Sequence, residues 1–199
     1  MSLNKIVITG GPSGGKTTLI EAIKKELGRE VTTVPEAASL LYRGGLPRAQ
    51  NDTTMIHVQR AIYYLQRELE GLVQDLSHTK TMVCDRGSLD GLAYWPTLVN
   101  TPFFQSLHTS EEAEIHRYHW VLHLDTASDG HYETTNPLRT ESFDEAWKLN
   151  EKIKNAWRNH PRHLIVPSST DFFSKMTLCL HLVRSIMKGK SYEELKSEI

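Results

Sequence analysis

Short apolar runs alternate along the chain with longer segments in which apolar residues recur at helical spacing. Five of these runs are apolar nearly throughout or rich in β-branched residues, and their length of four or five residues is typical of strands. We predict strands over residues 5–9, 31–34, 81–85, 120–124 and 163–166. Because strands that are apolar on both faces are covered by helices on both sides, this pattern predicts an α/β fold with a mainly parallel sheet.

The segments between these strands predict helices. Helical spacing and start signals place them over residues 16–27, 35–42, 53–77, a short stretch from Ser110, 142–158 and 171–187. In the longest helix, the recurring apolar residues are Val58, Ile62, Leu65, Leu69, Leu72, Val73 and Leu76.

Several helix boundaries can be read from cap residues. Ser142, with a glutamate three residues later, forms a capping box, and either Thr170 or Asp171 caps the last long helix. Residues 96–110 are expected to be irregular, and the polar tail from Lys188 is expected to form a loose, short helix.

Composition excludes several classes of function. The 23 basic and 24 acidic residues give a formal charge of −1, which provides no basic excess for a nucleic-acid partner. The apolar runs are far shorter than the ~20 residues that span a bilayer. The first strand begins within a few residues of Met1, which leaves no room for a signal peptide, so we expect a cytoplasmic protein. Without a repeat or linker, residues 1–199 are expected to form a single domain.

Cysteines and histidines give no signal of a metal site or disulfide. Cys84 lies in an apolar strand pattern and Cys179 in a helical one, so both are predicted to be core residues of a reduced protein. His116, His119 and His123 lie close together in the sequence but match no zinc-binding spacing.

The strongest motif lies at Gly10 to Thr17, where G-G-P-S-G-G-K-T matches the phosphate-binding pattern G-x-x-x-x-G-K-[ST] in full. A predicted strand precedes it and a predicted helix follows, so backbone N–H groups can converge at the positive end of that helix. We expect Lys16 to reach the β- and γ-phosphates and the Thr17 hydroxyl to hold Mg²⁺. The predicted nucleotide-binding residues are Gly11, Pro12, Ser13, Gly14, Gly15, Lys16, Thr17 and Thr18.

Two acidic residues stand at the carboxyl ends of predicted strands, which line the ligand crevice of an open parallel sheet. Asp85 is expected to hold Mg²⁺ with Thr17, and Arg86 beside it to bind a phosphate or substrate oxygen. The alternative is a solvated aspartate and an ordinary ion pair. Glu36 is a candidate general base, with Asp85 as its rival for that role, and a favourable helix N-terminal glutamate is the simpler interpretation.

The polar segment 126–141 has no apolar period, and a loop of this length is usually functional or disordered. Its single arginine, Arg139, could meet the charge of a moving phosphoryl group from a closing lid, or could be a solvated loop residue. Arg43, Arg48 and Arg60 are interpreted as surface charge.

Taken together, these motifs resemble those of the AAA family of P-loop kinase-like ATPases that includes the ribosylnicotinamide kinase domain. More broadly, the chain is similar to nucleoside and nucleotide monophosphate kinases. The matching stretches are T-G-G-P-S-G-G-K-T-T at 9–18, V-P-E-A-A at 34–38, C-D-R-G-S-L-D at 84–90, R-T-E-S at 139–142 and V-P-S-S-T-D-F-F at 166–173.

The resemblance implies a three-layer α/β/α P-loop NTPase fold with a five-stranded, mainly parallel sheet and a lid over about 126–141. It implies ATP or GTP with Mg²⁺, and catalytic roles for Lys16, Asp85, Arg86 and Arg139. Glu36 matches the position of a substrate-side acid in deoxynucleoside kinases. Those kinases usually carry more than one lid arginine, so this chain departs from them in having one.

We therefore expect a kinase that transfers the γ-phosphoryl of ATP to an unidentified small-molecule acceptor resembling a nucleoside. A nucleotide-driven ATPase or GTPase switch acting on a protein partner is the alternative, although the guanine-reading pattern N-K-x-D is absent. A nucleotide-binding module without catalysis is the third hypothesis.

Overall fold

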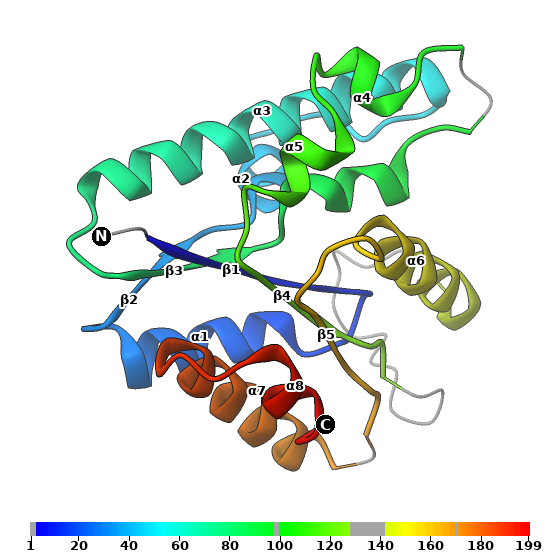
Figure 1. Ribbon diagram of the computed structural model, residues 1–199. Coiled ribbons are helices and arrows are strands. Elements are labelled where there is room, and N and C mark those ends of the chain that lie inside the picture. The colour runs from blue at the N-terminus through cyan, green and yellow to red at the C-terminus, as the bar shows by residue number, and fades with distance from the viewer. Residues whose placement is uncertain (1–2, 98–99, 128–141, 170) are drawn as a thin grey trace.

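The computed structural model describes residues 3–97, 100–127, 142–169 and 171–199 (Figure 1). Its five strands form one sheet in the order β2-β3-β1-β4-β5, and every neighbouring pair is parallel. The strands are β1 (Asn4–Gly10), β2 (Val31–Val34), β3 (Thr81–Asp85), β4 (Trp120–Leu124) and β5 (His163–Val166). The predicted three-layer α/β/α fold is confirmed, and all strand ends that precede candidate site residues lie at one edge.

Helices cover both faces of this sheet, and β1 at its centre contacts both layers. Ile6 and Ile8 pack in the core against α1 (Lys16–Leu27) and α7 (Phe172–Met187). Val7 points to the opposite face, because successive strand residues alternate, and packs in the core that includes α6 (Phe143–Ala156). Figure 1 shows α1, α7 and α8 (Tyr192–Lys196) on one side, and α3 (Asp52–Leu76), α5 (Glu111–Ile115) and α6 on the other.

The longest helix, α3, is present as predicted, but its buried face is more polar than the apolar spacing indicates. Leu72 and Leu76 are 56% and 70% exposed. Buried residues of the helix are Val58, Gln59, Tyr63, Gln66 and Glu70. A helix with buried polar groups has to satisfy them by hydrogen bonding, so this face carries a network rather than an apolar seam.

Other elements differ from expectation in small ways. A four-residue helix, α4 (Phe103–Ser106), lies inside the stretch expected to be irregular. The 3₁₀-helix η1 (Ser88–Tyr94) follows β3 directly, and α2 (Ala37–Arg43) begins after Glu36. Asp171 caps α7, since its side chain accepts from the backbone N–H groups of the next turn.

Both cysteines are core residues, as predicted. Cys84 and Cys179 are both buried and unpaired. Within the described ranges, no group of three or more His, Cys, Asp or Glu side chains is placed to hold a metal ion. No helix in the described part of the chain is long and apolar enough to cross a membrane.

Candidate functional site

The phosphate loop connects β1 to α1 through three residues in the left-handed region of backbone space. Gly10, Ser13 and Gly15 have φ angles of +129°, +59° and +95°. Left-handed geometry is easily adopted by glycine, which lacks the Cβ that makes it costly for other residues. These turns bring the chain from the end of the central strand directly into the first turn of α1.

Two glycines in the loop are required by close approach rather than by φ. A Cβ on Gly11 would lie 2.1 Å from Thr126 Oγ1 and 2.7 Å from Asn150 Cβ. A Cβ on Gly14 would lie 2.7 Å from the backbone oxygen of Leu124. The loop therefore rests on the end of β4 and on α6, with no space for any side chain between them.

Replacing Gly11 by alanine is expected to lower the free energy of unfolding by about 1–3 kcal/mol, because the added methyl group overpacks this contact. Gly71→Ala is the matched control, since its Cβ meets nothing within 4 Å in the interior of α3. That change should stabilise the protein by about 0.5–1 kcal/mol through helix propensity. Urea unfolding measures both; an equal response of the two variants would contradict the packing argument.

Asn150 on α6 holds the phosphate loop by a hydrogen bond to its backbone. Its Oδ1 accepts from the backbone N–H of Gly11 at 3.0 Å and from that of Thr126 at 3.3 Å, and it lies 3.0 Å from His123 Nε2. Its Nδ2 donates to Asp125 Oδ1 at 2.8 Å. One buried amide therefore joins the phosphate loop to the segment that leaves β4, which the sequence analysis did not anticipate.

Lys16 begins α1, and its ammonium folds back over the loop. Its Nζ donates to the backbone oxygen of Gly11 at 2.6 Å. Burial of the ammonium, together with the positive charge of Arg86, lowers the Lys16 pKa from 10.5 to about 7. A phosphate placed in the loop would offer the opposite charge and favour the protonated ammonium again.

Arg86 joins three parts of the site. It follows β3 in left-handed geometry, with φ +73°, and its N–H donates to the backbone oxygen of Ile8 at 3.0 Å. Its guanidinium donates to Glu36 Oε1 at 2.8 Å, to the backbone oxygen of Gly10 at 3.2 Å and to Asp90 Oδ2 at 3.2 Å. The planar fork of an arginine suits such a bridge, because its five N–H groups point in fixed directions.

The pKa values of two carboxylates beside this arginine are shifted in opposite directions. Burial opposes ionisation of Glu36, but the charge of Arg86 and a hydrogen bond from Ser39 outweigh it, so the Glu36 pKa is lowered. Burial, and then the negative charge of Glu36, raises the Asp85 pKa to about 6. A cation would relieve the crowded negative charge at Asp85.

The donor set fits a hard divalent cation. The Asp85 carboxylate and the Thr17 hydroxyl supply oxygen ligands of the kind that Mg²⁺ takes alongside water and phosphate oxygens. Asp85 pairs with Ile8 of β1, two residues before the loop begins. Thr17 and Thr18 are exposed in the first turn of α1, where a ligand can reach them.

The structure thus brings Lys16, Glu36, Asp85 and Arg86 to one edge of the sheet, and the charges of the other three all act on Lys16. Arg139 lies outside the described residues. Of the three arginines interpreted as surface charge, Arg43 and Arg48 are exposed, whereas Arg60 is partly buried. The Arg48 guanidinium lies 4.2 Å from the centre of the Tyr42 ring.

Asp90 is a site residue whose role the sequence analysis did not assign. It is 4% exposed and accepts hydrogen bonds from Thr9 Oγ1 at 2.7 Å and Trp157 Nε1 at 2.6 Å, besides the one from Arg86. Its place in the D-R-G-S-L-D stretch gave a weak signal, since the chain turns into η1 after Arg86 and brings Asp90 back beside it. Trp95, which follows η1, is buried in an apolar cluster with Tyr63, Phe103 and Leu107.

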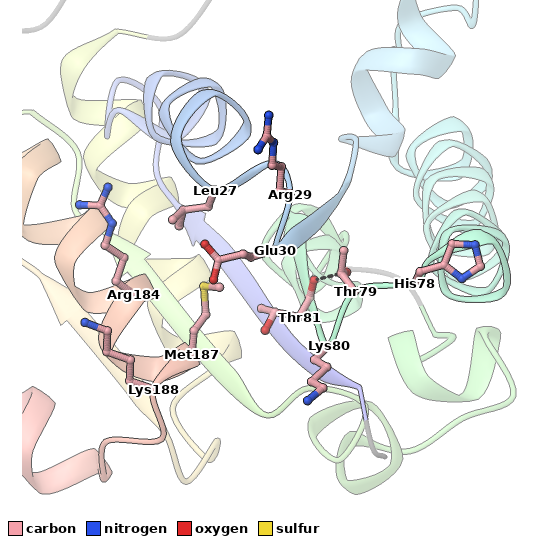
Figure 2. A pocket seen from close by; sticks show the side chains of 10 residues that line it. All are labelled: Leu27, Arg29, Glu30, His78, Thr79, Lys80, Thr81, Arg184, Met187 and Lys188. Atoms are coloured by element: carbon pink, nitrogen blue, oxygen red, sulfur yellow. Dashed lines mark hydrogen bonds between the residues drawn. The ribbon is translucent and has the colours of Figure 1, made fainter.

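A hollow of about 540 Å³ lies at the opposite edge of the sheet, where α1 ends and β3 begins (Figure 2). Its lining includes the basic residues Arg29, Lys80, Arg184 and Lys188. Figure 2 shows the charged ends of Arg29 and Lys80 pointing to opposite sides, so they do not converge on one ligand. The candidate site is therefore the edge that carries the phosphate loop.

A family model described as AAA domain matches residues 5–175, most of the chain and every described site residue above. The chain belongs to the AAA domain family. No curated protein sequence matches it.

Three solved structures that share the fold of this AAA-domain protein are those of kinases. Thymidylate kinase from Ehrlichia chaffeensis has a TM-score of 0.62 and 16% identity, over 94% of this chain and 100% of the other. Deoxyadenosine kinase from M. mycoides with bound dATP has a TM-score of 0.59 and 14% identity, over 91% and 100%. Thymidylate kinase from Candida albicans has a TM-score of 0.57 and 17% identity, over 94% and 93%. At these identities the likeness shows the fold.

Proposed function

We propose that this protein is an ATP-dependent small-molecule kinase that transfers the γ-phosphoryl group to a hydroxyl or phosphate of a nucleoside-like acceptor. The observation that carries the proposal is the bridge made by Arg86 between Glu36, on the acceptor side, and the Gly10 carbonyl of the phosphate loop. A guanidinium in that place would lie beside both reacting groups if the acceptor binds next to Glu36. Kinases of nucleotides and nucleosides with the same fold support the acceptor class.

In this mechanism the loop N–H groups and Lys16 bind the phosphate chain of ATP. When bound, Mg²⁺ held by Thr17 and Asp85 would neutralise phosphate charge. Glu36 takes the proton of the acceptor hydroxyl as the acceptor oxygen bonds to the γ-phosphorus, and the bond to the β-phosphate oxygen breaks to leave ADP. Arg86 offers positive charge to the equatorial oxygens, where charge is spread in the transition state.

Asp85 remains the rival for the proton-accepting role, because its raised pKa of about 6 is closer to that of an effective base at neutral pH. Glu36 stands at the start of α2 and is joined to the loop through Arg86, which supports an acceptor bound beside it. A Mg²⁺ ion at Asp85 would also occupy that carboxylate. We therefore assign the base to Glu36 and the cation to Asp85.

Parallel thermal-shift and ADP-release assays test the proposal, with Mg·ATP or Mg·GTP and a panel of nucleosides, nucleotides and vitamins. A true acceptor should add stabilisation to that of the nucleotide and should accelerate ADP release. Nucleotide stabilisation without any acceptor effect would contradict the kinase. Basal hydrolysis that only a protein partner accelerates would identify a switch instead.

A further inference from the structure

A buried carboxylate of α3 is linked to Arg86 through Gln66, which donates hydrogen bonds to both residues. Glu70 of α3 is 0% exposed. Its Oε1 accepts from Tyr118 Oη at 2.7 Å and from Gln66 Nε2 at 3.2 Å, and its Oε2 accepts from Arg117 Nη2 at 2.7 Å. The carboxylate is therefore the centre of a network that joins α3 to the segment before β4.

Two members of this network also hold the turn that carries Arg86. The backbone N–H of Ser88 donates to Tyr118 Oη at 2.9 Å. Gln66 Nε2 donates to the backbone oxygen of Arg86 at 3.3 Å. With the bond from the Arg86 N–H to Ile8, the turn over residues 86–88 is tied on both sides.

Burying such a network costs desolvation free energy, so it is expected where directional hydrogen bonds do what apolar packing cannot. Taking a carboxylate out of water is unfavourable, and a paired buried charge often stabilises no better than apolar residues of the same volume. Arg86 is itself in left-handed geometry, which a residue with a side chain holds only where its surroundings impose it. The network supplies directional hydrogen bonds at the two places where this turn needs them.

We infer that Glu70, Tyr118 and Gln66 are positioning residues that hold Arg86 in the geometry needed for phosphoryl transfer. This inference rests on the proposed function, because it acts through the Arg86 guanidinium. Arg86 meets developing charge in the transition state, so a loosened turn should lower kcat and leave the KM for Mg·ATP nearly unchanged.

Tyr118→Phe tests the inference, because it removes one oxygen that bonds both Glu70 and Ser88 and leaves the ring in place. Tyr63→Phe is the matched control: Tyr63 is also buried, and its Oη donates to the buried carboxylate of Glu114 at 2.6 Å. Both variants lose one buried tyrosine hydroxyl. We expect kcat for ADP release from Mg·ATP to fall about tenfold in Tyr118→Phe and to change less than twofold in Tyr63→Phe.

A double-mutant cycle separates positioning from a general loss of stability. In an Arg86→Ala background, Tyr118→Phe should lower kcat no further, because the group it positions is gone. An equal loss of kcat in both backgrounds, or equal effects of the two tyrosine variants, would overturn the inference. If Tyr118→Phe does not fold, Gln66→Met gives the same cycle, since it removes the donor to the Arg86 carbonyl.

The assay also keeps this inference apart from the proposed function. The kcat measurements use the acceptor of the nucleoside, nucleotide and vitamin panel that gives the fastest ADP release. If no acceptor accelerates ADP release, hydrolysis by water is measured instead. Transfer to an acceptor of the panel that both tyrosine variants retain in full would overturn the positioning role and leave the kinase intact. Absence of ADP release by the unmodified chain would overturn the kinase first and, with it, the role assigned to Arg86.

Discussion

Replacing Lys16 by alanine is expected to weaken Mg·ATP binding and to lower kcat together. The ammonium donates to the loop carbonyl of Gly11 at 2.6 Å, beside the place where the phosphates would lie. Removing a preorganised charge from such a site costs on the order of 3 kcal/mol of transition-state stabilisation, or a factor of at least 100 in kcat/KM. Isothermal titration with Mg·ATP and the ADP-release assay measure the two effects.

Lys24→Ala is the control for this change. Lys24 lies on the same helix, is half exposed and pairs with Glu21 at 2.9 Å, so its removal takes one positive charge from α1 without touching the loop. We expect no more than a twofold change in either assay, because such surface pairs contribute little. Activity retained by Lys16→Ala would remove this lysine from the site assignment.

Glu36→Gln is expected to lower turnover by about 100-fold while Mg·ATP binds as before. The amide is nearly the same size as the carboxylate but cannot take up the acceptor's proton, and a general base contributes roughly 10²–10⁴ in rate. Because the proposed role of Glu36 concerns the acceptor and not the phosphates of ATP, nucleotide affinity should be insensitive to the change. Single-turnover rates and nucleotide titrations separate these two quantities.

The control for Glu36→Gln must also break an arginine pair. Glu26→Gln does so, since Glu26 pairs with Arg184 on the exposed surfaces of α1 and α7. It should leave turnover unchanged. Equal losses of nucleotide affinity and turnover in Glu36→Gln would indicate a structural role for Glu36, and full activity would give the base role to Asp85.

Sheet and phosphate loop could be predicted from the sequence because each depends on neighbouring residues. A run such as Val31–Val34 is read as a strand from its own side chains, and the glycine pattern needs only a strand before it and a helix after it. The meeting of Glu36 and Asp85 at one edge then follows from parallel strands alone. Topology therefore placed the acidic residues without any knowledge of side-chain contacts.

The buried polar contacts could not be predicted in this way. Asn150 reaches Gly11 across 139 positions of sequence, and Trp157 reaches Asp90 across 67. On an amphipathic helix pattern, a lone asparagine or glutamate is assigned to the solvent face, which is where Glu70 would have been placed. Only the way α3 and α6 pack on the sheet makes these residues internal.

The central place of β1 has a consequence for the order in which the chain acquires its fold. Its two partners, β3 and β4, are residues 81–85 and 120–124, so β1 is synthesised well before either of its neighbours. Non-local strand pairing of this kind forms late, because the intervening chain must first be closed into a loop. The phosphate loop is thus synthesised before β3 and β4 but reaches its native conformation only after these strands pair with β1. Nucleotide binding by a growing or refolding chain would report completion of the sheet, not the presence of the motif.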